Sequence, residues 1–156
     1  DFCLSRGLGD VYKRQILIPV DGSELALAAV RHALELVGHG LKARFVLVNV
    51  QEPANLYEVV TARDPQVLQQ VSESAGRDQL RDAVALLQAA GQQVEAVVVS
   101  GDPAQAILEQ QEAFGCQAIT LSARGAGALK SVFMGSVSQA VLKDSPVPVT
   151  VVHAEQ

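Results

Sequence analysis

Two glycines and a serine in the last third of the chain have the types and the spacing that suit the binding of a phosphate group. Residues 118–121, Ala-Ile-Thr-Leu, predict a buried strand, and Gly125 follows it closely. Nine residues separate Gly125 from Gly135, and Ser136 comes next, where the pattern predicts the start of a helix. The backbone N–H groups of such a loop and a helix N-terminus can together hold an anion. The same residues are also consistent with an ordinary loop in which the glycines only turn the chain.

Each residue of this loop has a property of its own. Gly125 lets the backbone adopt a positive φ and lets a ligand approach closely. Ser136 can cap the helix and can offer its hydroxyl and its N–H to an anion. Arg124 and Lys130 flank the loop and are either cations that neutralise phosphate charge or solvated surface residues.

The two commonest phosphate-binding motifs are excluded by spacing. No glycine is followed, after four residues, by Gly-Lys-Ser or Gly-Lys-Thr. The dinucleotide motif G-x-G-x-x-G fails from Gly125 because Lys130 stands at the position of its third glycine. A phosphate site in this loop would therefore be of a different kind.

Asp21 is the second candidate for binding. It follows the apolar run at residues 16–20 and precedes Gly22 and Ser23, which is typical of a turn before a helix. Its carboxylate can cap that helix, the usual role of aspartate at such a position. Beside the glycine loop it can instead accept hydrogen bonds from a base or a ribose. The sequence leaves both interpretations open.

The sequence shows no catalytic set. Its histidines, His32, His39 and His153, are scattered and form no metal-binding spacing with Cys116 or with nearby carboxylates. Cys116 opens an apolar stretch, so we expect it to be buried and inert. Because no base is placed near a nucleophile, covalent catalysis is not expected.

The composition indicates a soluble domain with an aliphatic core. Of the 156 residues 49% are hydrophobic and only 4% aromatic, which suits helices packed on a parallel sheet. The formal net charge of −5 and the pI near 5.1 argue against a nucleic-acid surface, and no apolar run approaches the length of a membrane span. The two cysteines form no disulfide framework. We therefore expect a cytoplasmic protein whose partners include neither nucleic acid nor a membrane.

The first fifteen residues differ from the rest of the chain. Residues 1–15 show no periodicity, no helix cap and no signal-peptide order. Residues 10–15, Asp-Val-Tyr-Lys-Arg-Gln, resemble the translated end of a sequencing adapter. We expect residues 1–15 to be non-native sequence, with a natural disordered tail as the alternative, and residues 16–156 to form a single domain.

Strand and helix patterns alternate from residue 16 onward. The helix starts include two Asp-Pro pairs, at Asp64 and at Asp102, which place a capping residue before a proline. Alternation with short connections predicts an α/β domain with an open, mainly parallel five-stranded sheet and helices on both faces. Such sheets bind ligands beyond the carboxyl ends of their strands, where the strand order reverses. The predicted strands are 16–20, 44–50, 94–99, 116–121 and 148–152, and the predicted helices are 24–38, 64–91, 102–115 and 136–144.

With these motifs in place, the chain resembles the universal stress protein family over nearly the whole of residues 16–152. Ile-Leu-Ile-Pro-Val-Asp-Gly-Ser at 16–23 is similar to the family's opening strand and turn. Ser-Gly-Asp-Pro-Ala at 100–104 is similar to its third strand-to-helix junction, and Ser-Pro-Val-Pro-Val-Thr-Val-Val at 145–152 to its last strand.

The glycine loop also resembles the loop of the family's ATP-binding members. Those members carry a glycine, two residues, a second glycine, nine residues, and then Gly-Ser or Gly-Thr. Gly125, Gly135 and Ser136 fit this pattern, whereas Ser122 stands at the position of the first glycine. Serine resists a positive φ and adds bulk beside a ligand.

The resemblance implies a fold, a ligand and an assembly. The fold would be Rossmann-like, similar to the adenine-nucleotide α-hydrolases, and the ligand ATP, with Mg or Mn accompanying the nucleotide. A homodimer would form through the last strand, from Pro148 to Val152, an apolar edge that would otherwise be exposed. From the adenine end through the middle to the ribose and phosphates, the implied site residues are Pro19, Asp21 and Val50, then Leu121, Ser122 and Gly125, then Gly135, Ser136 and Val137.

Two hypotheses of different classes follow. The first is an ATP- or adenine-nucleotide-binding sensor or regulator of the stress response, with slow hydrolysis at most. The alternative is a nucleotide-independent dimeric interaction module of the same fold, which Ser122 favours. A true enzyme, such as a ligase or a pyrophosphatase, has no support in the residues.

Overall fold

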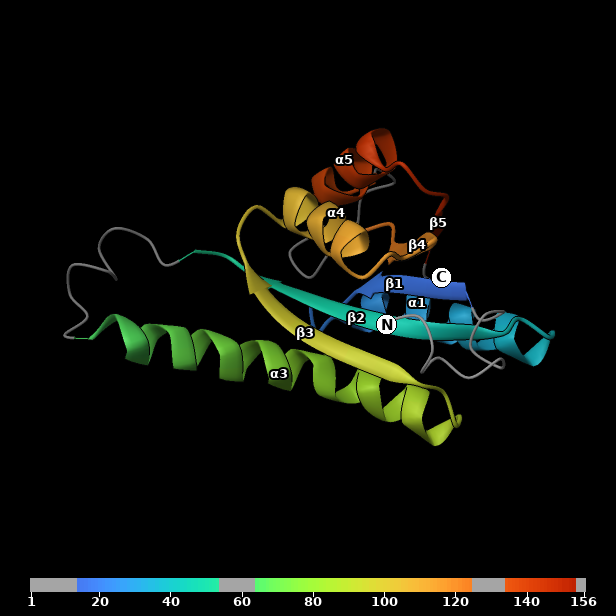
Figure 1. Ribbon diagram of the computed structural model, residues 1–156, viewed down its shortest axis with the longest axis horizontal. Coiled ribbons are helices and arrows are strands. Elements are labelled where there is room, and N and C mark those ends of the chain that lie inside the picture. Colours follow the sequence, from blue (N-terminus) through green and yellow to red (C-terminus); the bar gives the residue numbers. More distant parts are fainter. Residues whose placement is uncertain (1–13, 54–63, 125–133, 154–156) are drawn as a thin grey trace, which may run out of the picture.

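The computed structural model is built around a five-stranded sheet whose pairings are all parallel (Figure 1). The structure describes residues 14–53, 64–124 and 134–153. Within them the strand order is β3-β2-β1-β4-β5, so the first strand of the chain lies in the middle of the sheet. The strands are β1 (Arg14–Pro19), β2 (Ala43–Gln51), β3 (Val94–Ser100), β4 (Ala118–Ser122) and β5 (Val149–Val152). The predicted α/β fold is confirmed.

The helices in the described part of the chain cover both faces of this sheet. Figure 1 shows α3 along one face of the strands and α4 with α5 on the other. Three of the helix starts are capped by the residues that precede them, because the side chains of Ser23, Asp64 and Asp102 accept hydrogen bonds from backbone N–H groups of the first turn. The helices are α1 (Glu24–Gly38), α3 (Pro65–Ala89), α4 (Pro103–Ala113) and α5 (Ser136–Asp144).

The apolar core has two halves, one on each face of the sheet. Along β1, Ile16 and Ile18 pack against α1 and α3, whereas Leu17 packs on the α4 and α5 side. This alternation follows from the pleat of a strand, and because both faces are covered, neighbouring residues are all apolar. Other fully buried side chains are Phe45, Leu47 and Leu87 in the first half and Val46, Val48, Ile119 and Val141 in the second.

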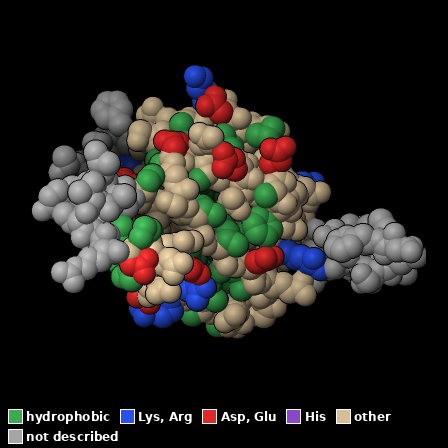
Figure 2. All heavy atoms as spheres, turned by 60° about the vertical axis from the view of Figure 1, so that its left-hand side comes forward, with side chains coloured by type: hydrophobic (Ala, Val, Ile, Leu, Met, Phe, Trp, Pro, Cys, Tyr) green, Lys and Arg blue, Asp and Glu red, His purple; other side chains and the backbone are tan. Residues whose placement is uncertain are grey.

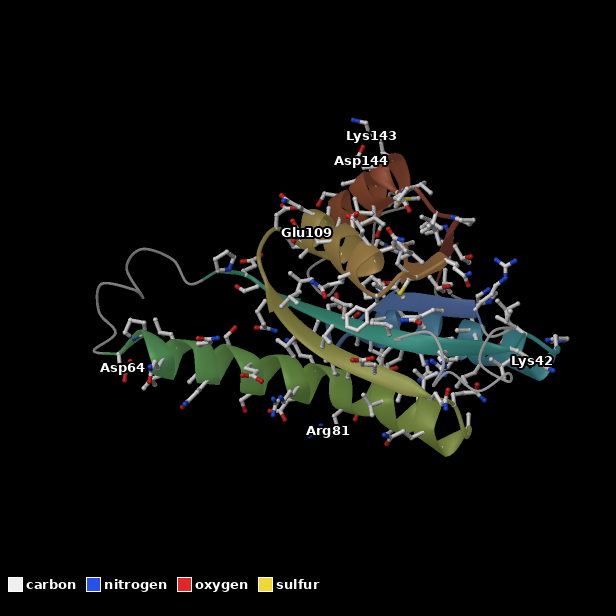
Figure 3. The ribbon with its side chains drawn as sticks, in the orientation of Figure 1. Lys42, Asp64, Arg81, Glu109, Lys143 and Asp144 are labelled. Carbon is white, nitrogen blue, oxygen red and sulfur yellow. The ribbon has the colours of Figure 1, made fainter. Side chains whose placement is uncertain are left out.

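Charged side chains lie on the outer surfaces of the helices. Figure 3 shows Arg81 on the side of α3 that faces away from the strands, and Lys143 at the outer end of α5. Acidic and basic side chains are interspersed on the face of the molecule shown in Figure 2. None of the helices built from the described residues is long and apolar enough to cross a bilayer.

The first strand begins two residues earlier than predicted. Arg14 donates its backbone N–H to the Lys42 carbonyl (3.0 Å), so pairing with β2 already starts there. The Gln15 side chain donates to the Phe114 carbonyl (3.0 Å), and the Gln15 carbonyl accepts from Gln117 N (2.8 Å). The predicted start of the first strand at residue 16 is therefore wrong by two residues, and the expected domain bounds stay a prediction. Residues 1–13 lie outside the described residues, and the proposed origin of the first segment stays a prediction.

Candidate functional site

A cleft of about 540 Å³ opens at the carboxyl ends of β1 and β4. These strands are neighbours in the sheet, but the chain leaves them in opposite directions. Helix α1 leads from β1 to β2 on one side, and α5 leads from β4 to β5 on the other. The strand order therefore reverses between β1 and β4, which is where open parallel sheets form ligand sites. The volume is in the range of small-molecule sites.

The fold brings eight of the nine predicted site residues to this cleft. They come from the end of β1 and its turn, from β2, and from the segment that joins β4 to α5. The ninth, Gly125, lies outside the described residues. The eight that line the cleft are Pro19, Asp21, Val50, Leu121, Ser122, Gly135, Ser136 and Val137. Their contact with a ligand stays a prediction.

The cleft has further walls that the sequence did not single out. Strand pleating could have identified Val48 and Glu52, because they alternate with the predicted Val50 along the end of β2 and the residue after it. No local pattern connects the α4 residues Pro103 and Ile107 with this cleft. The additional lining residues are Val20, Val48, Glu52, Pro103, Ile107, Arg124 and Ser138, of which only Arg124 had been considered from the sequence.

The turn after β1 is shaped by Asp21. Its Oδ1 accepts hydrogen bonds from the Ser23 backbone N–H (3.0 Å) and from the Ser23 hydroxyl (2.6 Å). The Ser23 Oγ in turn accepts from Ala26 N (3.1 Å), so Ser23 is the residue that caps α1. Asp21 therefore does not cap the helix itself. It fixes the capping residue and lies at the wall of the cleft.

The two ends of the glycine loop are joined by two hydrogen bonds, and a third shapes its first end. Ser122 Oγ donates to the Arg124 carbonyl (2.8 Å), and Ser138 Oγ donates to the Ser122 carbonyl (2.9 Å). The Gly135 N–H donates to the Ala123 carbonyl (2.8 Å). These bonds place the N-terminus of α5 directly beside the end of β4.

The start of α5 differs from the prediction. Gly135 occupies the capping position with an extended backbone, and Ser136 is the first helical residue, so the capping role expected of Ser136 is wrong. The Gly135 N–H is already bonded to Ala123. Because the first N–H groups of a helix have no intrahelical acceptor, an anion in the cleft would meet those of Ser136 and Val137.

The model of the universal stress protein family matches residues 13–153. The chain belongs to this family. A universal stress protein of Thermus aquaticus is 33% identical over 142 residues, which cover 90% of this chain and 98% of that protein. The solved structure of MJ0577 from Methanocaldococcus jannaschii has a TM-score of 0.78 and 26% identity, and the match covers 93% of this chain and 99% of that one.

Two more distant structures share the fold and carry adenine nucleotides. A universal stress protein in complex with cAMP has a TM-score of 0.67 and 21% identity, over 92% of this chain and 99% of that one. A family protein from Arabidopsis thaliana with AMP bound has a TM-score of 0.64 and 17% identity, over 91% and 92% of the two chains. At these identities the likeness shows the fold alone.

Ser122 is compatible with its position in this universal stress protein. It is the last residue of β4, and no non-glycine residue in the described part of the chain has a positive φ. Its hydroxyl is turned back to the Arg124 carbonyl. Serine therefore causes no backbone strain here, and its side chain affects the cleft only by the volume that it occupies.

The described lining of the cleft carries carboxylates and hydroxyls. This lining includes Asp21 and Glu52 but neither histidine nor cysteine. Among the described residues no group of three or more His, Cys, Asp or Glu is placed to hold a metal ion. Cys116, only 2% exposed, lies before β4, and burial raises the pKa of its thiol to about 11. Its predicted burial is confirmed.

Proposed function

We propose that this universal stress protein binds an adenine nucleotide, ATP in the first place, and acts as a sensor or regulator of the stress response. The main support for the proposal is that the cleft between the carboxyl ends of β1 and β4, where the strand order reverses, has two chemically different parts. One part is apolar, and the other contains the N-terminus of a helix. Two family structures with cAMP and AMP support the choice of an adenine nucleotide.

The apolar part suits a flat aromatic base. Pro19, Val48, Val50 and Leu121 provide aliphatic surface from three adjacent strands and their ends. Burial of a base between such side chains is favourable because it removes apolar area from water. The polar edge of the base and the ribose would face the turn at Asp21, which has a carboxylate to accept hydrogen bonds.

The other part suits phosphates. The N–H groups of Ser136 and Val137 and the positive end of the α5 dipole would bind the negative charge, and the Ser136 hydroxyl adds a donor. Arg124 also lines the cleft. Mg or Mn would be bound mainly by the phosphates, because metal–nucleotide sites use few protein ligands.

The lining residues favour binding over turnover. Within the described lining the carboxylates are those of Asp21 and Glu52, and Asp21 Oδ1 already accepts two hydrogen bonds from Ser23. The proposal therefore allows slow ATP hydrolysis at most.

A homodimer through β5 belongs to the same proposal. Strand β5 (Val149–Val152) lies at one edge of the sheet, beside β4, and three of its four residues are partly buried valines. A second copy pairing there would cover an apolar edge.

The decisive experiment is extraction of nucleotide from the purified protein, followed by calorimetric titration with ATP, AMP, cAMP and adenosine. Ser136→Asp places a negative charge where the phosphates would lie, and we expect it to weaken ATP binding at least about tenfold while adenosine binding changes little. An aspartate in the first helical turn favours the helix, so unfolding does not explain such a loss.

Gln139→Asp is the control for the added charge, since Gln139 is exposed on the same helix, does not line the cleft and loses one hydrogen bond, to the Met134 carbonyl. It should affect ATP binding much less. The proposal would be refuted if the purified protein contains no nucleotide and binds none at millimolar concentration. The alternative, a nucleotide-independent dimeric interaction module, would then remain.

A further inference from the structure

A buried asparagine joins β2, helix α3 and the turn after β1. Asn49 is 1% exposed and lies on the face of β2 that packs against α3, opposite the cleft-lining Val48 and Val50. Its Nδ2 donates to the Val20 carbonyl (2.8 Å) and to Gln79 Oε1 of α3 (2.7 Å). Its Oδ1 accepts from Gln51 Nε2 (2.5 Å). The buried amide thus has a partner for each of its donor hydrogens and for its oxygen.

The group that Asn49 holds is part of the proposed site. Val20 lines the cleft and immediately precedes Asp21. Its N–H donates to the Val48 carbonyl (2.8 Å), and its carbonyl accepts from Asn49. Both backbone polar groups of Val20 are therefore fixed by β2, one through the main chain and one through a side chain.

The same helix residue supports the next part of the turn. Gly22 has a φ of +81°, and a Cβ added there would lie 2.9 Å from Gln79 Cγ. The turn backbone therefore rests against the aliphatic part of Gln79, while Gln79 Oε1 accepts from Asn49 and, at 3.1 Å, from Gln51 Nε2. One exposed side chain of α3 thus contacts the turn directly and also orients the amide that holds it.

Helix α3 reaches this position because Gly76 has no side chain. A Cβ at Gly76 would lie 2.8 Å from Asn49 Oδ1, so the helix axis is unusually close to the sheet at this turn. Gln79 is three residues further on and lies on the same side of the helix. The close approach at Gly76 is what puts the Gln79 amide within hydrogen-bond distance of Asn49.

We propose that Asn49 and Gln79 form a positioning pair for the turn at residues 20–23 and thereby set the affinity of the cleft for the base and ribose of its ligand. The inference rests on the proposed function, because the turn carries Asp21. Neither residue lines the cleft among its described walls, so they act through Val20 and Gly22. Helix α3 thus influences ligand affinity through the turn, although none of its described residues lines the cleft.

The test separates the acceptor atom of Gln79 from its aliphatic stem. Gln79→Met keeps the stem against Gly22 and removes the acceptor, whereas Gln79→Glu keeps both. Gln70→Met is the matched control, since Gln70 is an exposed glutamine of the same helix. Two quantities are measured in the full chain: the affinity for adenosine, which has no phosphate charge, and the exchange rates of the Gly22 and Ser23 backbone amides by NMR.

We expect Gln79→Met to weaken adenosine binding about threefold to tenfold and to speed exchange of the turn amides by a similar factor, the effect of one hydrogen bond. Exchange in the central strands should stay unchanged, a selectivity that general loss of stability would not produce. Gln79→Glu and Gln70→Met should behave like the wild type.

Unchanged turn exchange in Gln79→Met would overturn the inference, and so would faster exchange with unaltered adenosine affinity. If the wild type binds neither adenosine nor ATP, the proposed function fails. The claim that the pair sets affinity then fails with it, and the exchange rates alone decide whether the pair holds the turn.

Discussion

Replacing Gly76 by alanine tests how closely α3 packs on the sheet. Gly76 is buried in the middle of a 25-residue helix, where glycine is otherwise unfavourable. An added Cβ would lie 2.4 Å from Val98 Cγ1 and 2.8 Å from Asn49 Oδ1. Both distances are far below van der Waals contact, so the helix, the valine or the asparagine has to move.

The magnitude follows from three contributions. Alanine gains about 1 kcal/mol over glycine in helix propensity. Overpacking of a well-filled site costs about 1–3 kcal/mol. Displacement of the Asn49 amide weakens buried hydrogen bonds and adds about 1–2 kcal/mol. The net effect is a destabilisation of about 1–4 kcal/mol, or roughly 3–12 °C in Tm for a domain of this size.

The assay is urea and thermal unfolding of Gly76→Ala beside Gly38→Ala. Gly38 is the last residue of α1, and a Cβ there meets nothing within 4 Å. The control should therefore leave the free energy of unfolding unchanged or raise it by up to about 1 kcal/mol. If Gly76→Ala proves as stable as the wild type, the close approach of α3 to β2 and β3 is refuted.

Three further predictions concern other parts of the molecule. Ser122→Gly should lower the free energy of unfolding by about 1–2 kcal/mol, because it removes one partly buried hydrogen bond and adds the backbone freedom of glycine to a strand, with no strain to relieve. A stabilisation in urea unfolding would contradict the extended backbone of Ser122. Burial raises the pKa of Cys116 from 9.0 to about 11, so the folded state favours the neutral thiol. The contribution of this thiol to the free energy of unfolding is therefore fully present below pH 9 and is lost between pH 9 and 11. Unfolding curves across this range should show the loss in the wild type and not in Cys116→Ala, and equal slopes in the two proteins would exclude it. The Pro148 and Val152 carbonyls accept hydrogen bonds from β4 and the residue after it, so the backbone N–H of Val151 faces the open edge of β5, and Val151→Pro should block pairing with a second copy there. Light scattering at micromolar concentration should find a dimer for the wild type and a monomer for the variant, and a monomeric wild type would remove the dimer.

Much of the fold could be predicted because its signals are local. The Asp-Pro pairs at Asp64 and Asp102 mark helix starts through caps that involve only the next few residues. The apolar runs mark strands because both faces of a parallel sheet are covered. The end positions were less well predicted: β1 extends back to Arg14, since its pairing with Lys42 and Ala43 depends on a strand thirty residues away.

The candidate site could be predicted where it coincides with these junctions. The turn at Asp21 and the junction at Gly135 and Ser136 follow strands, and the carboxyl ends of parallel strands lie at one edge of the sheet. The capping roles of individual residues were predicted less well. Ser23 rather than Asp21 caps α1, and Gly135 rather than Ser136 caps α5, because the choice depends on backbone geometry that a residue type alone does not specify.

The sequence by itself thus determined which segments are strands and helices, the class of the sheet, and the junctions that carry polar residues. Only the tertiary structure decided the strand order β3-β2-β1-β4-β5, and with it the cleft between β1 and β4. It also decided that α3 packs closely on the sheet at Gly76 and that Asn49 forms hydrogen bonds with Val20 and Gln79. These contacts join residues about thirty positions apart, and whether they form depends on how layers pack, which no local spacing records.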